Sequence, residues 1–190
     1  MAMRKDGAKQ NLRLQPLNLA QKLTMCSQVA LGMEHLFNSH LVHQDLAARN
    51  VLLSSTLDLK IASLSLCRDV YATEYFVLRQ RPVPLRWMAP EAVLEDDYSV
   101  KSDVWSFGVF AWEVFTCADL PLRRWTDDEI VKELNLSLAA TRCCLECPPA
   151  CPPEMWTSIE KCTADTPRDR PTFDEIAMTI GDMTADSDDL

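Results

Sequence analysis

Apolar residues recur at helical spacing in several stretches of the chain. The first stretch follows Asn18, whose side chain can cap a helix, and Gln21 can complete a capping box three residues on. One apolar stripe runs along this expected helix and consists of Leu19, Leu23, Cys26, Val29, Ala30, Met33 and Leu36. The pattern predicts a core helix near the start of the chain.

The most apolar stretch follows Ser102, which we expect to be the N-cap of a second helix. Asp103 lies in its first turn, where the helix dipole favours an anion. Its apolar residues cover most of the helix circumference and are Val104, Phe107, Val109, Phe110, Trp112, Val114 and Phe115. We therefore expect this helix to be buried on nearly all sides.

Three shorter helices are expected in the second half of the chain. Thr126 and Glu129 form a capping-box pair, which predicts a helix of about eight residues. Thr172 and Glu175 form another, and the last helix carries Phe173, Ile176, Met178 and Ile180. Between them, a helix is predicted over roughly 154–162.

Short apolar runs predict β structure in the first half. Residues 41–42 are expected as a short strand, and residues 51–53 and 57–61 flank a polar turn and predict a hairpin. Residues 68–81 show no sustained period, which predicts a mobile loop. Residues 82–84 contain two prolines and are expected to stay extended.

Composition and charge exclude several classes of protein. A chain of 190 residues with 47% hydrophobic and 25% charged residues suits one globular domain. Its net charge of −9 argues against nucleic acid or an anionic membrane as a partner. No apolar run approaches the length of a membrane span, and no apolar segment follows the charged first residues as in a secretory signal.

The eight cysteines leave two interpretations open. Without a secretory signal we expect reduced thiols, and four dispersed residues are expected as small buried hydrophobes: Cys26, Cys67, Cys117 and Cys162. The other four are clustered and are Cys143, Cys144, Cys147 and Cys151. Cys144 and Cys147 have the C-x-x-C spacing of a metal knuckle, but no second pair completes a zinc site. The cluster is either a surface loop or a cysteine-based metal-binding module.

The motif that carries most information about function is His43-Gln44-Asp45-Leu46-Ala47-Ala48-Arg49-Asn50. It resembles the catalytic loop of the protein tyrosine kinases, H-R-D-L-A-A-R-N. Three further segments resemble that family in order and spacing: Pro84–Glu91, Ser102–Gly108 and Arg168–Phe173. The resemblance implies a protein-kinase-like α+β fold, of which this chain resembles the mainly helical C-lobe with a short β-hairpin, the N-lobe being absent.

The resemblance also implies a domain division and residue roles. The C-lobe would span 17–182, after a disordered N-terminal end at 1–16 and before an acidic disordered tail at 183–190. The family positions for catalysis are Asp45 as proton acceptor, Arg49 beside the substrate hydroxyl and Asn50 as a magnesium ligand. The structural positions are His43 beneath the loop, Asp103 as acceptor of loop N–H groups, and the ion pair of Glu91 with Arg170.

The chain departs from the family at the metal-binding step. The family's Asp-Phe-Gly is replaced by Ser63, Leu64 and Ser65, and a neutral hydroxyl is a far weaker magnesium ligand than a carboxylate. No glycine-rich loop or pairing lysine precedes Asn18, so the roof of a nucleotide site is missing. We therefore expect no cofactor, although active family members use ATP and Mg²⁺.

The family's activation and substrate loops also have counterparts. Tyr71 and Tyr75 lie in the activation-loop region. Gln44 replaces the arginine that, in the family, binds a phosphate group on that loop. The expected substrate loop consists of Pro84, Leu85, Arg86, Trp87 and Met88. A further departure is Thr163, which follows Cys162 where the family has a tryptophan.

Within the family, the chain resembles inactive receptor-type members most strongly, which are single-pass cell-surface proteins of Wnt and planar-polarity signalling and cell adhesion. This implies a truncated pseudokinase that acts as a scaffold for protein partners. It would be cytoplasmic alone, or on the cytoplasmic side of the plasma membrane within a full-length receptor. An active tyrosine kinase fragment is the alternative. Exposed apolar residues of the cleft floor, around Leu41, Leu53 and Leu64, predict self-association.

Overall fold

The computed structural model describes residues 16–62, 74–136 and 144–188. Its helices are α1 (Leu19–Asn38), α2 (Pro90–Glu95), α3 (Val100–Thr116), α4 (Asp127–Leu136), α5 (Pro153–Cys162) and α6 (Phe173–Asp188). Its strands are β1 (Val51–Leu53), β2 (Leu59–Ile61), β3 (Phe76–Leu78) and β4 (Arg81–Val83). Three short 3-10 helices are η1 (Ala48–Asn50), η4 (Leu85–Trp87) and η5 (Pro167–Asp169). This is the predicted helical lobe, with two small hairpins where one was expected.

The first helix begins where the sequence predicts. The Asn18 side chain accepts a 2.8 Å hydrogen bond from the Gln21 N–H, and the Gln21 side chain accepts one of 3.0 Å from the Asn18 N–H. Most of the predicted stripe on α1 is buried, and Leu36 packs against the core. Leu19 is 41% exposed, so its place in the predicted core stripe is wrong.

Helix α3 lies at the centre of the core but begins three residues earlier than predicted. Its N-cap is Ser99, and Ser102 is the other member of that capping box, so the predicted cap at Ser102 is wrong. Asp103 is in the first turn as expected, and twelve of the 17 residues are buried. The ring of Phe107 meets that of Phe173 edge-on at 5.9 Å, which joins α3 to α6.

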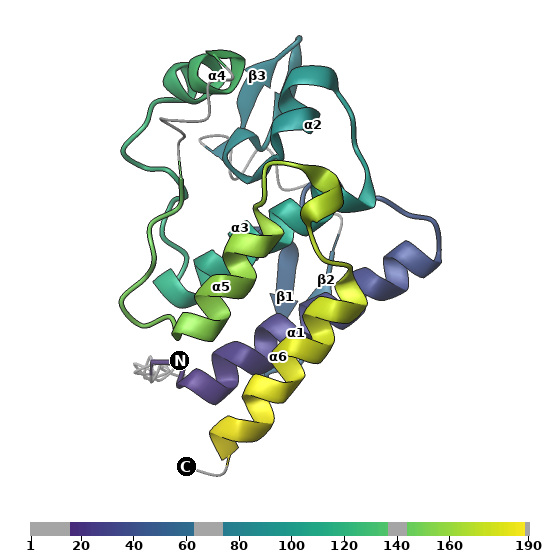
Figure 1. Ribbon diagram of the computed structural model, residues 1–190, viewed down its shortest axis with the longest axis vertical. Coiled ribbons are helices and arrows are strands. Elements are labelled where there is room, and N and C mark those ends of the chain that lie inside the picture. Colours follow the sequence, from purple (N-terminus) through teal and green to yellow (C-terminus); the bar gives the residue numbers. More distant parts are fainter. Residues whose placement is uncertain (1–15, 63–73, 137–143, 189–190) are drawn as a thin grey trace, which may run out of the picture.

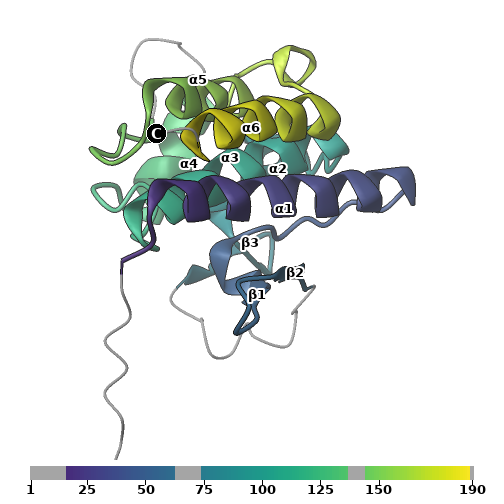
Figure 2. The same cartoon turned by 90° about the horizontal axis from the view of Figure 1, so that it is seen from below.

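The helices pack around α3, and the β1–β2 hairpin lies beside them (Figure 2). α1 and α6 run side by side in both views, and Figure 2 shows β1 and β2 on the opposite side of α1 from α6. A second apolar cluster joins α2, α4 and the β3–β4 hairpin at the other end of the molecule (Figure 1). The loop that carries Asp45 (residues 43–50) contacts both α3 and the end of the first hairpin.

The β structure differs from the expectation in two places. The hairpin of β1 with β2 is confirmed, but residues 41–42 form no strand. Residues 76–78 and 81–83 pair as β3 and β4, so the loop predicted for 68–81 is wrong over 76–81, and 68–73 lie outside the described residues. The turn of this hairpin is made by Arg79 and Gln80, both with positive φ, and neither is a usual turn residue.

The last three helices follow their predicted starts. Thr126 with Glu129 and Thr172 with Glu175 form the expected capping pairs. Met178 is 64% exposed, which contradicts its place in the predicted apolar stripe. Helix α6 continues to Asp188, so residues 183–188 extend a helix instead of forming the disordered tail expected from 183.

Candidate functional site

The loop that carries Asp45 is held by the first turn of α3. The Asp103 carboxylate, which is 2% exposed, accepts hydrogen bonds from the backbone N–H groups of His43 at 2.7 Å and Gln44 at 2.9 Å. Burial raises the pKa of Asp103, and these two donors oppose that shift. Gln44 has a φ of 68°, so the two bonds hold a backbone turn that a residue with a side chain rarely adopts.

His43 connects this loop to the end of the first hairpin. Its Nδ1 accepts a 3.3 Å hydrogen bond from the Asp45 N–H, and its Nε2 lies 3.3 Å from the Ala62 carbonyl oxygen. Nδ1 acts as an acceptor here, so the Nε2–H is the donor to Ala62. The imidazole thus lies beneath the loop and fixes its backbone.

Asp45 is engaged by two side chains of its own chain. Its Oδ1 lies 2.5 Å from Nη2 of Arg49, and its Oδ2 accepts a 2.6 Å hydrogen bond from the Tyr75 hydroxyl. Arg49 also pairs with Glu74 at 3.1 Å and lies over the indole of Trp87, 4.3 Å from the ring centroid. Both oxygens of the expected proton acceptor therefore have donors within the chain.

The environment of Tyr75 keeps its phenol protonated. Partial burial raises its pKa first, and the hydrogen bond to Asp45 adds to that shift, while Arg49 opposes it. A neutral phenol donates to Asp45, whereas a phenolate would repel that carboxylate. The 30-residue separation between these two residues is bridged only by the fold.

Among the described residues, Asn50 alone has a buried side-chain oxygen or nitrogen without a hydrogen-bond partner. Its Nδ2 donates a 2.6 Å hydrogen bond to the Asp45 carbonyl oxygen, and its Oδ1 has no partner. One neutral amide oxygen does not make a magnesium site, because this ion is normally held by carboxylates. Among the described residues, no three His, Cys, Asp or Glu side chains gather where they could hold a metal. Of the family's metal-binding positions, Asn50 is described and offers one neutral oxygen.

Glu113 is a buried carboxylate that the sequence patterns did not single out. Its Oε2 accepts 2.9 Å hydrogen bonds from the Ala48 N–H and from Nε1 of Trp87. Burial raises its pKa to about 7, and these donors oppose the shift. Glu113 joins the loop of Asp45 to the expected substrate loop, and its sequence signal is an acid within the strongly apolar second half of α3.

The expected substrate loop is anchored in the protein. Pro84, Leu85, Trp87 and Met88 are buried, and residues 85–87 form η4. The guanidinium of Arg86 donates to the carbonyl oxygens of Pro121, Leu122 and Trp125 and pairs with Asp127 at 2.8 Å. Arg86 therefore faces the interior of the lobe, and a role of this loop in binding substrate stays a prediction.

The predicted pair of Glu91 and Arg170 is present. Two hydrogen bonds of 2.6 and 2.9 Å join the guanidinium to the carboxylate, and the Arg170 side chain is fully buried. Arg170 also donates to the carbonyl oxygens of Ala164 and Lys101. This pair fixes α2 to the segment that precedes α6.

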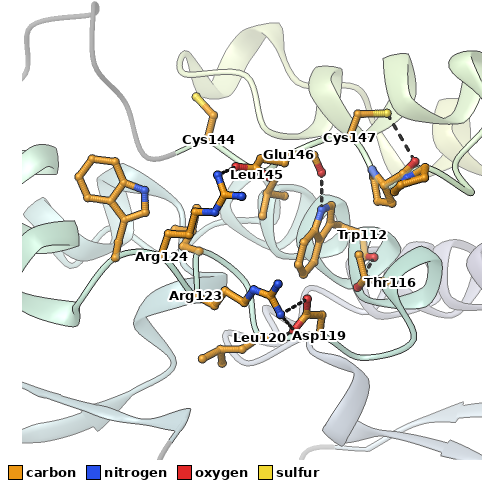
Figure 3. A pocket seen from close by; sticks show the side chains of 14 residues that line it. Trp112, Thr116, Asp119, Leu120, Arg123, Arg124, Cys144, Leu145, Glu146 and Cys147 are labelled. Atoms are coloured by element: carbon orange, nitrogen blue, oxygen red, sulfur yellow. Dashed lines mark hydrogen bonds and ion pairs between the residues drawn. The ribbon is translucent and has the colours of Figure 1, made fainter.

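Several predicted residues are not described, and the described cysteines of the cluster belong to no group of three residues that could hold a metal. Ser63, Leu64, Ser65, Cys67, Tyr71 and Cys143 lie outside the described residues. Figure 3 shows the thiols of Cys144 and Cys147 pointing apart, with the chain of Leu145 and Glu146 between them. Cys26 and Cys162 are buried as expected, whereas Cys117 is exposed, because it ends α3 in a left-handed turn.

Comparison with known proteins places these features in a family. A family model described as protein tyrosine and serine/threonine kinase matches residues 3–180. Inactive tyrosine-protein kinase 7 is 51% identical in Mus musculus and 49% in Homo sapiens, each over 178 residues that cover 94% of this chain and 16% of the relative. The high affinity nerve growth factor receptor of Rattus norvegicus is 38% identical over 85% of the chain and 20% of its own length. The chain thus spans a sixth to a fifth of these relatives.

Proposed function

The chain belongs to the protein tyrosine kinase family, and we propose that it is a pseudokinase domain that binds proteins without transferring phosphate. The observation that carries this proposal is that both carboxylate oxygens of Asp45 accept hydrogen bonds from side chains of the same chain. A proton acceptor must lie within hydrogen-bond reach of the substrate hydroxyl. Here its two oxygens are bonded to Arg49 and Tyr75.

The metal-binding residues support the same proposal. The sequence has Ser63 where the family has the aspartate that holds magnesium, and Asn50 offers one neutral oxygen. Phosphoryl transfer depends on a metal ion that neutralises the phosphates. The names of the relatives at about 50% identity describe them as inactive kinases, in line with this deficit.

The binding role that we propose is that of a scaffold in receptor signalling of the Wnt and planar-polarity type and in cell adhesion, at the cytoplasmic face of the plasma membrane. No helix of the described residues is long and apolar enough to cross a membrane. Apolar side chains beside the Asp45 loop support a docking surface: Leu41, Leu52 and Leu53 are each more than half exposed. Such residues favour association with a protein or with a second copy.

Nucleotide binding and phosphate transfer test this proposal together. We expect ATP with Mg²⁺ to give no saturable rise in the unfolding temperature, because only a bound ligand stabilises the fold. We also expect that the chain does not label tyrosine with phosphate from radioactive ATP. Saturable stabilisation, or labelling that disappears in Asp45→Asn, would contradict the proposal.

A second candidate is an active tyrosine kinase lobe that works once a family N-lobe is attached. This candidate is favoured by Asn50, which stands at a family position for a magnesium ligand. Its side-chain Oδ1 has no hydrogen-bond partner among the described residues. Attaching an N-lobe from an active family member distinguishes the two. Phosphotyrosine that depends on Asp45 would support the second candidate, and its absence would support the first.

A further inference from the structure

A cavity of about 230 Å³ lies away from Asp45, between α2, α3, α4 and α5. Its walls are largely apolar and include Met88 next to η4, Trp105 on α3, Leu134 on α4 and Trp156 on α5. The four side chains come from four separate elements, so the cavity is built by the fold.

The size of the cavity suits a single side chain. Pockets that enclose whole drug-sized ligands usually measure about 300–1,000 Å³, whereas an apolar cavity of about 150 Å³ can hold benzene. A volume of about 230 Å³ therefore fits one aromatic or leucine-sized group. A complete nucleotide or cofactor would not be enclosed.

The charged side chains that line the cavity are mostly acidic. Glu133 on α4 and Glu160 on α5 contribute carboxylates to its lining, and Asp165, which also lines it, already interacts within the chain. Arg86 is the one basic residue that the described part of the chain contributes to this lining, and Asp127 pairs with it at 2.8 Å. An occupant with a positive charge next to its apolar group would complement these carboxylates.

The neighbouring cavity of about 190 Å³ lacks this selectivity. Figure 3 shows its two arginines bonded to acidic residues of the same lining, Arg123 to Asp119 and Arg124 to Glu146. Its charges therefore compensate one another, and it does not favour an ionic occupant of either sign.

Thr163 helps to keep the larger cavity open. It lines the cavity directly after α5, and its hydroxyl donates a 3.0 Å hydrogen bond to the Ile159 carbonyl oxygen. This side chain is small at a position where the family pattern has a tryptophan. A larger side chain there would reduce the space, which makes this position a direct test of the cavity.

We propose that this cavity receives one aromatic or leucine-sized side chain of a partner protein, next to a lysine or arginine that pairs with Glu133 and Glu160. The inference specifies the chemistry of the partner that the proposed scaffold would bind, and it rests on that proposed function. Binding here does not use Asp45, so it can fail while the absence of phosphate transfer stands.

The test uses the whole chain with methyl-labelled methionine and leucine and the peptide Ac-Gly-Arg-Phe-Arg-Gly-NH₂. We expect saturable shifts of the Met88 and Leu134 methyl signals in NMR spectra. Replacing the peptide's phenylalanine by alanine should weaken binding about tenfold or more, because the buried apolar group is lost. Replacing its two arginines by glutamates should also abolish the shifts.

Two variants locate the site, and a third is the control. Thr163→Trp should remove binding by filling the cavity, and the surface double variant Glu133→Gln with Glu160→Gln should weaken it without affecting folding. Glu154→Gln, also on α5 but outside the lining, should bind as the original chain does.

Four results with the peptides and variants would overturn the inference, and a fifth comes from the protein alone. These are the absence of shifts at millimolar peptide, equal binding of the phenylalanine and alanine peptides, equal binding of the arginine and glutamate peptides, and unchanged binding by the folded double variant. Shifts of the same signals that depend on protein concentration without peptide would show that a second copy occupies the cavity, which also contradicts it.

Discussion

The Tyr75 hydroxyl donates a 2.6 Å hydrogen bond to the Asp45 carboxylate, so a tyrosine of the chain lies where a substrate hydroxyl would have to approach. Arg49 supports this arrangement because its Nε lies 3.2 Å from the same hydroxyl. The three side chains form one charge-assisted network, which is stronger than a neutral hydrogen bond. Each of them therefore depends on the other two for its position.

Removing the Tyr75 hydroxyl should destabilise the fold. We expect Tyr75→Phe to lower the free energy of unfolding by about 1–2 kcal/mol, since a hydrogen bond to a charged group is lost and the phenol is partly exposed. Urea unfolding of Tyr75→Phe, Asp45→Asn and the double variant measures the coupling. If the two single effects add without a coupling energy, the hydrogen bond does not contribute to stability.

The titration of Tyr75 should report the same contact. The raised pKa means that the fold favours the neutral phenol, so the stability it contributes is present below the ordinary tyrosine pKa and is lost above it. In Asp45→Asn the negative acceptor is gone, and the pKa of Tyr75 should fall. NMR of ring-labelled tyrosine follows this titration, and an equal or higher pKa in the variant would contradict the prediction.

Glu113 should make stability depend on pH. Its pKa is about 7 in the folded chain against an ordinary value of 4.5, so between these values the folded state keeps a proton that the unfolded state has lost. The free energy of unfolding should therefore decrease as pH rises from about 4.5 to 7 and this contribution should level off above 7.

The variant Glu113→Gln should remove that contribution and keep both hydrogen bonds. The difference between the original chain and the variant should change by roughly 3 kcal/mol at most across this window, since one pKa unit corresponds to about 1.4 kcal/mol. Urea unfolding at the two ends of the window gives this difference. A parallel pH dependence in both proteins would contradict the prediction.

The pair of Glu91 and Arg170 should be a main determinant of stability. Glu91→Gln leaves the fully buried Arg170 without its counter-charge and should cost about 3–5 kcal/mol. Arg168→Ala is the matched control, because its side chain is 86% exposed, and it should change stability by less than about 0.5 kcal/mol. Similar decreases in the free energy of unfolding in both variants would show that the buried pair contributes no more to stability than an exposed residue.

The exposed leucines beside the Asp45 loop should drive self-association. Replacing Leu41 and Leu53 by serine removes two apolar groups that are 55% and 53% exposed and should shift the chain towards monomer in sedimentation velocity. Met178→Ser on α6 is the control, with 64% exposure at a distant element. The prediction fails if the starting protein is already monomeric, or if the control has the same effect.

Interactions between near neighbours could be predicted from the sequence. The capping pairs of Asn18 with Gln21, and of Thr172 with Glu175, join residues three positions apart and formed as expected. The cap of α3 was misplaced because Ser99 and Ser102 are both good cap residues and the pattern could not choose between them. The β3–β4 hairpin was missed because its turn uses ordinary residues at positive φ.

The sequence by itself determined the starts of α1, α4 and α6, the family-like loop and the pair of Glu91 with Arg170, because short spacing or a family motif specifies each of them. Only the tertiary structure decided that Tyr75 contacts Asp45, that Glu113 joins Ala48 to Trp87, and that four elements enclose a cavity. These contacts join residues 26 to 65 positions apart in the chain or depend on space left between helices. Neither is encoded locally, since packing of the whole core sets both which side chains meet and which gaps remain.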